Sequence, residues 1–323
     1  MLGEIVISGW DWTIFVVAIL VALGIDLGVF HRKAHEVRFR EAIGWTIFWF
    51  ILAISFGLFI APEMAPNWGK TERDEFITGY IIELALSMDN VFVIALIFGY
   101  FGVPLKFQHR VLFWGILGAL IMRGVMIWLG TALIQKFHFV LYILGAFLVI
   151  TGFRMAFAAS DEKIEPEKNL FIRLTRRVFP VTTDFDGPHF TTRVDGRTAL
   201  TPLALVLVMV ETTDLIFAID SIPAIFGVTT NPFIVFTSNV FAILGLRSLY
   251  FVLAGAIGFF RYLKVGLSIV LCFIGAKMLI GKWHHISTTL SLLIVATIIV
   301  TSILMSLYAA RREADGHKRN QAE

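Results

Sequence analysis

Two stretches of this sequence place acidic and amide side chains inside long apolar segments. The first runs from Glu83 to Asn90 (ELALSMDN) and the second from Glu211 to Ser221 (ETTDLIFAIDS). An aspartate at mid-membrane costs about 2.5–3.5 kcal/mol on the insertion scale, so these carboxylates need a compensating partner. A bound cation would supply that partner, and we therefore interpret the two stretches as parts of a metal-ion site.

The predicted site consists of oxygen ligands. Its primary candidates, as ligands or proton acceptors, are Glu83, Asp89, Asn90, Glu211, Asp214 and Asp220. Its accessory candidates are Ser87, Asp26, Arg123, Arg247 and Asn239. Carboxylate and amide oxygens suit hard divalent ions such as Mn²⁺, Ca²⁺ and Mg²⁺, whereas zinc and copper favour thiolate and imidazole. The chain has one cysteine, and its eight histidines fall in connections or at helix edges. A soft-metal centre is therefore disfavoured.

The alternative interpretation treats the same acids as structural charges. The acids of both stretches could be neutral, or they could be paired with Arg123 or Arg247, which also fall inside hydrophobic segments. Asp26, near the end of the first apolar segment, could belong to the ion pathway or be a charge at a helix edge. The sequence leaves these alternatives open.

The composition places these segments in a membrane. Hydrophobic residues make up 58% of the chain and charged residues only 16%, which excludes an ordinary soluble domain. A helix of about 20 apolar residues spans the hydrocarbon core. Roughly nine such segments are present: 10–30, 41–61, 76–100, 108–133, 137–158, 200–226, 233–256, 261–281 and 286–309. We expect an all-α polytopic membrane protein.

The basic residues predict the orientation of the chain. Most of the 27 Lys and Arg residues fall in alternate connections and at the C-terminus. Under the positive-inside rule the N-terminus is outside and the C-terminus cytoplasmic, in a plasma membrane or bacterial inner membrane. The same asymmetry accounts for the net charge of +3, so nucleic-acid binding has little support. The start, MLGEIVISGWDW, lacks the basic region of a signal peptide, so we expect the first segment to be retained.

One long polar connection, residues 159–199, follows the fifth segment. Within it, NLFIRLTRRVF (169–179) alternates apolar and basic residues with roughly helical spacing. HFTTRVDGRTAL (189–200) contains an Asp-Gly pair typical of a type I′ hairpin. These patterns predict an interfacial helix and a hairpin packed under the bundle. A regulatory or partner-docking role is the alternative.

The chain also repeats itself at a nearly constant shift. DNVFVIA (89–95) aligns with DLIFAID (214–220), Arg123 with Arg247, and LVITGFRM (148–155) with LCFIGAKM (271–278). Helices three to five thus correspond to helices six to eight, and the odd number of spans makes the second unit inverted, as in many transporters. The predicted organisation is residues 1–75 with two peripheral helices, 76–158 and 200–281 as the repeats, 159–199 as a cytoplasmic insert, and 282–323 as the last helix and tail.

Helical geometry separates the candidate ligands. Glu83, Ser87 and Asn90 are spaced i, i+4 and i+7 and share one face. In the second stretch, Asp220 falls about half a turn from Glu211. Pro223 cannot donate a hydrogen bond to the carbonyl four residues earlier, so we expect a break in this helix that would redirect the Asp220 carboxylate toward the site.

Three motifs then match a known family. ELALSMDNVFV (83–93), ETTDLIFAIDSIPAIF (211–226) and TSNVFAILGLRSLYF (237–251) closely resemble the TerC family of membrane proteins, and the whole chain resembles its Alx-like members. The resemblance implies a place in the LysE-type transporter group and export of manganese, with calcium as a possible ion. The family name refers to tellurite resistance, and members are also linked to supplying metal to exported proteins.

We therefore predict a divalent-cation exporter, with Mn²⁺ favoured by the resemblance and no permanent cofactor. Moving two charges out against an inside-negative potential costs about 4.6 kcal/mol per 100 mV. The chain has no Walker A motif, so we expect coupling to protons through surplus carboxylates.

The expected partners are the lipid bilayer, the metal ion and protons, with other membrane proteins as candidates. The alternative is a non-transporting partner that passes metal to a secretion or tellurite-resistance complex. An enzyme is not expected, because the HExxH motif of an intramembrane metalloprotease is missing.

Overall fold

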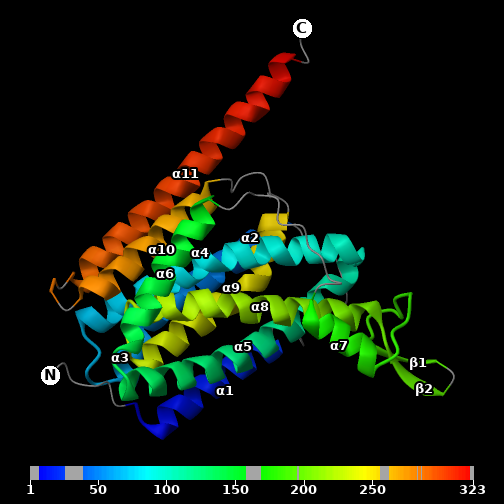
Figure 1. Cartoon of the computed structure of the whole chain (residues 1–323), viewed down its shortest axis with the longest axis horizontal. Helices are drawn as coiled ribbons and strands as arrows, with labels where there is room; N and C mark the ends of the chain where they lie inside the picture. The colour runs from blue at the N-terminus through cyan, green and yellow to red at the C-terminus, as the bar shows by residue number, and fades with distance from the viewer. Residues whose placement is uncertain are drawn as a thin grey trace.

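The computed structural model describes residues 7–25, 39–157, 169–194, 196–254, 262–281, 283–284 and 286–320. These residues form a helical bundle with one small hairpin (Figure 1). The helices are α1 (Gly9–Ile25), α2 (Phe39–Ser55), the π-helical turn η2 (Phe56–Ile60), α3 (Ala61–Met64), α4 (Lys70–Phe101), α5 (Leu105–Lys136), α6 (Val140–Phe157), α7 (Leu170–Val178), α8 (Pro202–Phe226), α9 (Pro232–Ala254), α10 (Leu263–Ile280) and α11 (Thr288–Asn320). The strands are β1 (Thr191–Val194) and β2 (Arg197–Leu200).

The described helices confirm an all-α polytopic membrane protein. Eight spans, counted over the described residues, are long and apolar enough to cross a bilayer, and one of them runs through α2, η2 and α3. The remaining predicted segment, the first one at 10–30, corresponds to α1, which has 17 residues in the described part of the chain. That is slightly less than the roughly 20 residues a span needs. Asp26, predicted as an accessory residue, lies outside the described residues.

Helix α9 lies at the centre of the bundle. It packs against α2, α4 and α5, and 94% of its apolar window is buried. The hydroxyl groups of Thr237 and Ser238 donate to carbonyls of their own helix, to Phe233 at 2.7 Å and Val235 at 3.2 Å. This back-bonding satisfies small polar side chains where no water is available. The next residue, Asn239, instead reaches across to another helix.

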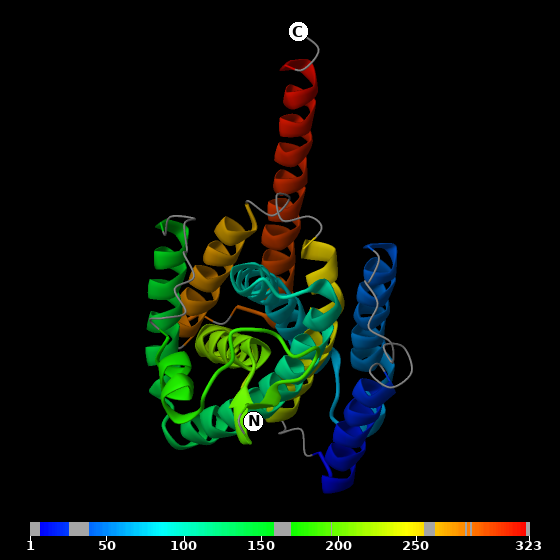
Figure 2. The ribbon, with the colours of Figure 1, turned by 90° about the vertical axis from the view of Figure 1, so that its right-hand side faces the viewer.

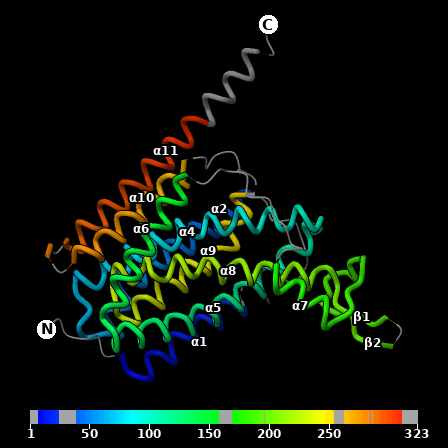
Figure 3. Tube along the Cα trace, viewed as in Figure 1, coloured from blue at the N-terminus to red at the C-terminus, as the bar shows by residue number. Residues whose placement is uncertain are grey.

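Helices α6 and α10 form a close antiparallel pair (Figures 2 and 3). A Cβ atom on Gly152 would lie 3.0 Å from the backbone N of Cys272, and one on Gly275 would lie 2.9 Å from the backbone N of Val149. Gly152 and Gly275 are equivalent in the sequence repeat, as are Val149 and Cys272. The two contacts are therefore reciprocal, which is what an in-plane two-fold axis between inverted repeats requires. The contacts support the repeat, whose full boundaries stay a prediction.

The polar connection contains the two predicted elements in its described part. Helix α7 packs against α8, with Leu170, Leu174 and Val178 exposed along one side. Strands β1 and β2 pair antiparallel, and Gly196 in their turn has φ 76°, a left-handed conformation that glycine adopts without strain. The helix and the hairpin predicted from the sequence are both confirmed.

The predicted break in the second acidic helix is wrong. Helix α8 runs continuously from Pro202 to Phe226, with Pro223 inside its last turn. The N–H of Gly227 donates to the Pro223 carbonyl at 3.0 Å and closes the helix. Residues on both sides of Pro223 are buried against neighbouring helices, and this packing holds the helical path despite the missing bond. An irregular turn occurs instead in the second span, at η2.

Candidate metal-ion site in the bundle

The buried guanidinium of Arg123 on α5 joins three other helices. Its Nη2 and Nε atoms donate to the two carboxylate oxygens of Asp214 on α8, at 2.8 and 3.2 Å. Its Nη1 donates to Oδ1 of Asn239 on α9 at 3.2 Å and forms an ion pair with Glu83 on α4. Arg123 is only 2% exposed and Glu83 is fully buried. The four spans α4, α5, α8 and α9 therefore each contribute one side chain to a single cluster, named here the arginine cluster.

Glycines let these helices come close enough for the contacts. A Cβ atom on Gly115 would lie 3.3 Å from the side chain of Val210, and one on Gly118 would overlap the carboxylate of Glu211. Between α4 and α9, a Cβ on Gly79 would lie 3.0 Å from the Ser238 hydroxyl oxygen. Small residues at such positions are the usual means of bringing membrane helices together. These glycines therefore set the short distances between helices at which Arg123 can reach Glu83 and Asp214.

A row of buried oxygens leads away from the arginine cluster along α4. Glu83, Ser87 and Asn90 lie on one face and are 0, 1 and 4% exposed. Among the described residues, both Glu83 carboxylate oxygens, Ser87 Oγ and Asn90 Oδ1 receive no hydrogen bond, although Glu83 is ion-paired with Arg123. The row extends about 10 Å along the helix axis at 1.5 Å per residue. Such groups are rare in folded proteins and call for an explanation, such as an ion or water that they bind.

The remaining primary candidates lie at other positions on α8 and α4. Glu211 lies one turn before Asp214 on α8 and against α5. Asp220 faces α6, where Thr151 hydrogen-bonds to it and Arg154 is the nearby cation. Asp89 on α4 is partly buried and makes interactions of its own, as does the buried Arg247.

The sequence interpretation missed two features of the site. It placed Arg123 among the accessory residues, whereas the structure puts this arginine at the centre. It also left out Ser221, whose buried hydroxyl finds no hydrogen-bond partner within the described chain. Ser221 is seven residues after Asp214 and on the same face of α8, a spacing from which it could have been recognised.

The arginine cluster carries one net negative charge if Glu83 and Asp214 are ionised, because Arg123 balances only one of them. Within the described residues, no three His, Cys, Asp or Glu side chains already converge in the manner of a metal centre. The acids are therefore arranged around a guanidinium. The groups that could bind a metal ion are nonetheless hard ligands, because the carboxylate, amide and hydroxyl groups all offer oxygen atoms.

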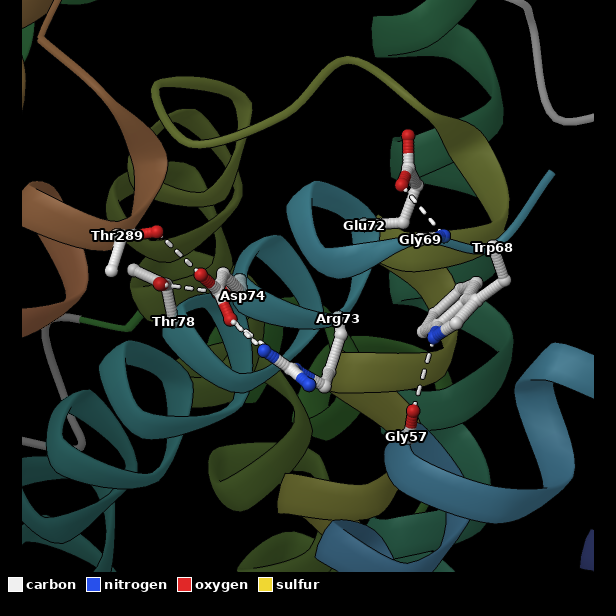
Figure 4. A network of polar contacts seen from close by, with 8 residues as sticks. All are labelled: Gly57, Trp68, Gly69, Glu72, Arg73, Asp74, Thr78 and Thr289. Atoms are coloured by element: carbon white, nitrogen blue, oxygen red, sulfur yellow. Dashed lines mark hydrogen bonds and ion pairs between the residues drawn. The ribbon is translucent and has the colours of Figure 1, made fainter.

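A second polar network fixes the N-terminal end of α4 (Figure 4). The buried carboxylate of Asp74 accepts a hydrogen bond from the Thr289 hydroxyl at 2.6 Å, at the start of α11. It also pairs with Arg73 at 3.3 Å. The indole of Trp68 donates to the Gly57 carbonyl in η2 at 3.0 Å. These bonds tie α4 to its neighbours and so hold the helix that carries Glu83.

The fold and the arginine cluster define a polytopic helical membrane protein with an ion-paired polar site inside its bundle. The chain belongs to the TerC family, because the model described as "Integral membrane protein TerC family" matches residues 68–314. No solved structure matches the chain.

Similar proteins extend over nearly the whole chain. An "Uncharacterized membrane protein STKORF319" of Myxococcus xanthus is 49% identical over 311 residues, which cover 95% of this chain and 96% of that protein. A "Putative membrane-bound redox modulator Alx" of Salmonella typhi is 45% identical, covering 92% of this chain and 94% of the relative. The protein of the same name in Escherichia coli is 44% identical, covering 93% and 95%. The resemblance predicted from the three motifs is confirmed.

Proposed function

We propose that the protein exports a hard divalent cation, with Mn²⁺ as the preferred ion, across the membrane that it spans. The observation that supports this most is the row of buried oxygens on α4, which ends at two ion-paired carboxylates. Intramembrane charges at a helix interface are typical of ion pathways. The choice of manganese rests on the resemblance to Alx-like members of the family, since the oxygen ligands alone also suit Ca²⁺ and Mg²⁺.

Export against an inside-negative potential requires an energy source. Inward proton movement is the proposed source, with Glu211 as the acceptor beside the site because it lies one turn from Asp214. The proposed orientation has the C-terminus in the cytoplasm, as the positive-inside rule predicts. The membrane is a plasma membrane or a bacterial inner membrane.

Two of these relatives are named as membrane-bound redox modulators, but this chain lacks the pair of cysteines that thiol redox chemistry uses. Its single cysteine, Cys272, lies between α6 and α10, with Sγ 3.8 Å from the Val149 carbonyl oxygen. Exchange between a dithiol and a disulfide needs two cysteines. Transport, rather than an enzymatic or redox reaction, is therefore the proposed activity.

Metal accumulation in cells tests the choice of ion. Cells lacking the protein should accumulate more Mn²⁺ than parental cells when Mn²⁺ is in excess, with little change for Zn²⁺ or Cu²⁺. The unmodified gene should restore the lower Mn²⁺ level, and a gene encoding Asp184→Asn should do the same. Asp184 is the control because it is exposed in the polar connection. Equal accumulation of all three metals would contradict a hard-oxygen site.

A further inference from the structure

Arg123 is held by oxygen atoms of the kind that a divalent cation binds. Its guanidinium is held by Glu83, Asp214 and Asn239 Oδ1, from three different helices. Carboxylate and amide oxygens are also the ligands that a hard divalent ion requires. The guanidinium and a metal ion would compete for these oxygens and would repel each other, because both are cations.

We propose that Arg123 is a built-in substitute for the transported ion: it occupies the site when the metal is absent, and the arriving metal displaces it. This inference rests on the proposed function. It assigns to Arg123 a role different from that of a permanent structural ion pair, because the pair must open in every transport cycle.

The charges in the cluster favour such an exchange. Without Arg123, the empty site would bury the two carboxylates of Glu83 and Asp214 without the cation that pairs with both of them, and uncompensated buried charge is strongly unfavourable. With Arg123 the empty site carries one net negative charge. A divalent ion bound between the same two carboxylates balances both of their charges. The metal-bound site therefore does not require the guanidinium for charge compensation.

The structure also offers a place for the displaced guanidinium. Glu211 lies on α8 three residues before Asp214, a rise of about 4.5 Å along the helix axis. Its carboxylate lies where the side chain of Gly118 would be, so it faces the helix that carries Arg123. Arginine side chains on a helix lean toward its N-terminus, which is the direction from Arg123 to Gly118. With the metal bound and Arg123 paired to Glu211, the charges of all three acids are balanced.

The proposal separates two kinds of flux. Net efflux requires the empty site to reorient, whereas exchange of Mn²⁺ for Mn²⁺ requires only the metal-loaded site to reorient. Arg123→Gln removes the substitute cation and leaves the acids in place. Its ratio of net efflux to exchange should therefore fall about tenfold or more relative to the unmodified protein, with the loss mainly in net efflux.

The experiment uses the full chain, purified and reconstituted in liposomes with radioactive Mn²⁺. Net efflux is measured into metal-free buffer and exchange into buffer containing unlabelled Mn²⁺. Arg110→Gln is the matched control, because Arg110 lies on the same helix but contacts the ring of Phe190; its flux ratio should equal that of the unmodified protein. Arg123→Lys keeps a cation and should retain part of the net efflux.

Two results would overturn the role of Arg123. In Arg123→Gln, the flux ratio stays unchanged. In a folded Arg123→Lys, both fluxes are lost together, which would mark a structural ion pair. If Arg123→Gln does not fold, Arg123→Lys decides alone, and loss of exchange along with net efflux contradicts the proposal. A different result, no flux of either kind in the unmodified protein, would instead contradict the proposed function.

Discussion

Replacing Asp214 by asparagine removes one of the two carboxylates that bind Arg123. The side chain keeps its shape and one oxygen, but it loses its charge. A unit charge about 4 Å from a divalent ion contributes about 8 kcal/mol at an effective dielectric constant of 20, before any change in solvation. Retaining even about 2 kcal/mol of this difference corresponds to more than a tenfold loss in affinity. We therefore expect Mn²⁺ transport by Asp214→Asn to fall at least about tenfold.

The same substitution should leave the fold intact. Arg123 keeps its ion pair with Glu83, so the arginine is not left as an unpaired buried charge, and neutral Asn is less costly than Asp to place in a bilayer. The assay is Mn²⁺ flux in liposomes at equal amounts of reconstituted protein, with the exposed Asp184→Asn as control. Normal flux in Asp214→Asn would refute this account of the site and mark Asp214 as a structural charge.

Three further experiments test the surrounding structure. In the sequence repeat, Asp89 and Arg247 are the counterparts of Asp214 and Arg123. If they pair in the same way, a double-mutant cycle of Asp89→Asn and Arg247→Gln should give a coupling energy of about 1 kcal/mol or more in the free energy of unfolding. Additive effects would contradict the pairing. Asp74→Ala removes the bond to the first turn of α11 and should lower the free energy of unfolding in detergent by about 1.5–3 kcal/mol. An unchanged value would show that this network is unimportant. Gly275→Leu would bring a Cβ atom within 2.6 Å of a backbone oxygen of α6 and should destabilise the protein by about 1–3 kcal/mol. Gly44→Leu, with open space around its Cβ, is the control and should have a smaller effect; equal effects would contradict the close packing of α6 and α10.

The membrane spans and the hairpin could be predicted because their signals are local. Runs of apolar residues define most of the spans, and the Asp-Gly pair before β2 defines the turn. Pro223 misled the prediction for the opposite reason. Its local effect favours a break, but the residues on both sides of it are buried and α8 continues as one helix. Packing of that kind depends on contacts distant in the sequence.

The arginine cluster could be predicted only in part. The spacing of Glu83, Ser87 and Asn90 predicted that they share one face of a helix, and the burial of all three on α4 agrees with that prediction. Spacing could not show that Arg123 reaches three helices at once, because the separation of the helices depends on glycine contacts between them. Without a break in α8, Asp220 stays on another side of that helix and faces α6. The sequence therefore identifies the acids, while the arrangement around Arg123 comes from the tertiary structure.

Net Mn²⁺ flux by the purified protein alone in liposomes tests the central claim most directly. A transporter should move Mn²⁺ without any other protein, faster than Zn²⁺ and faster than in liposomes without protein. An inward proton gradient should accelerate Mn²⁺ export. Binding of Mn²⁺ without any flux would contradict the account and would favour the alternative of a membrane partner that hands metal to another complex.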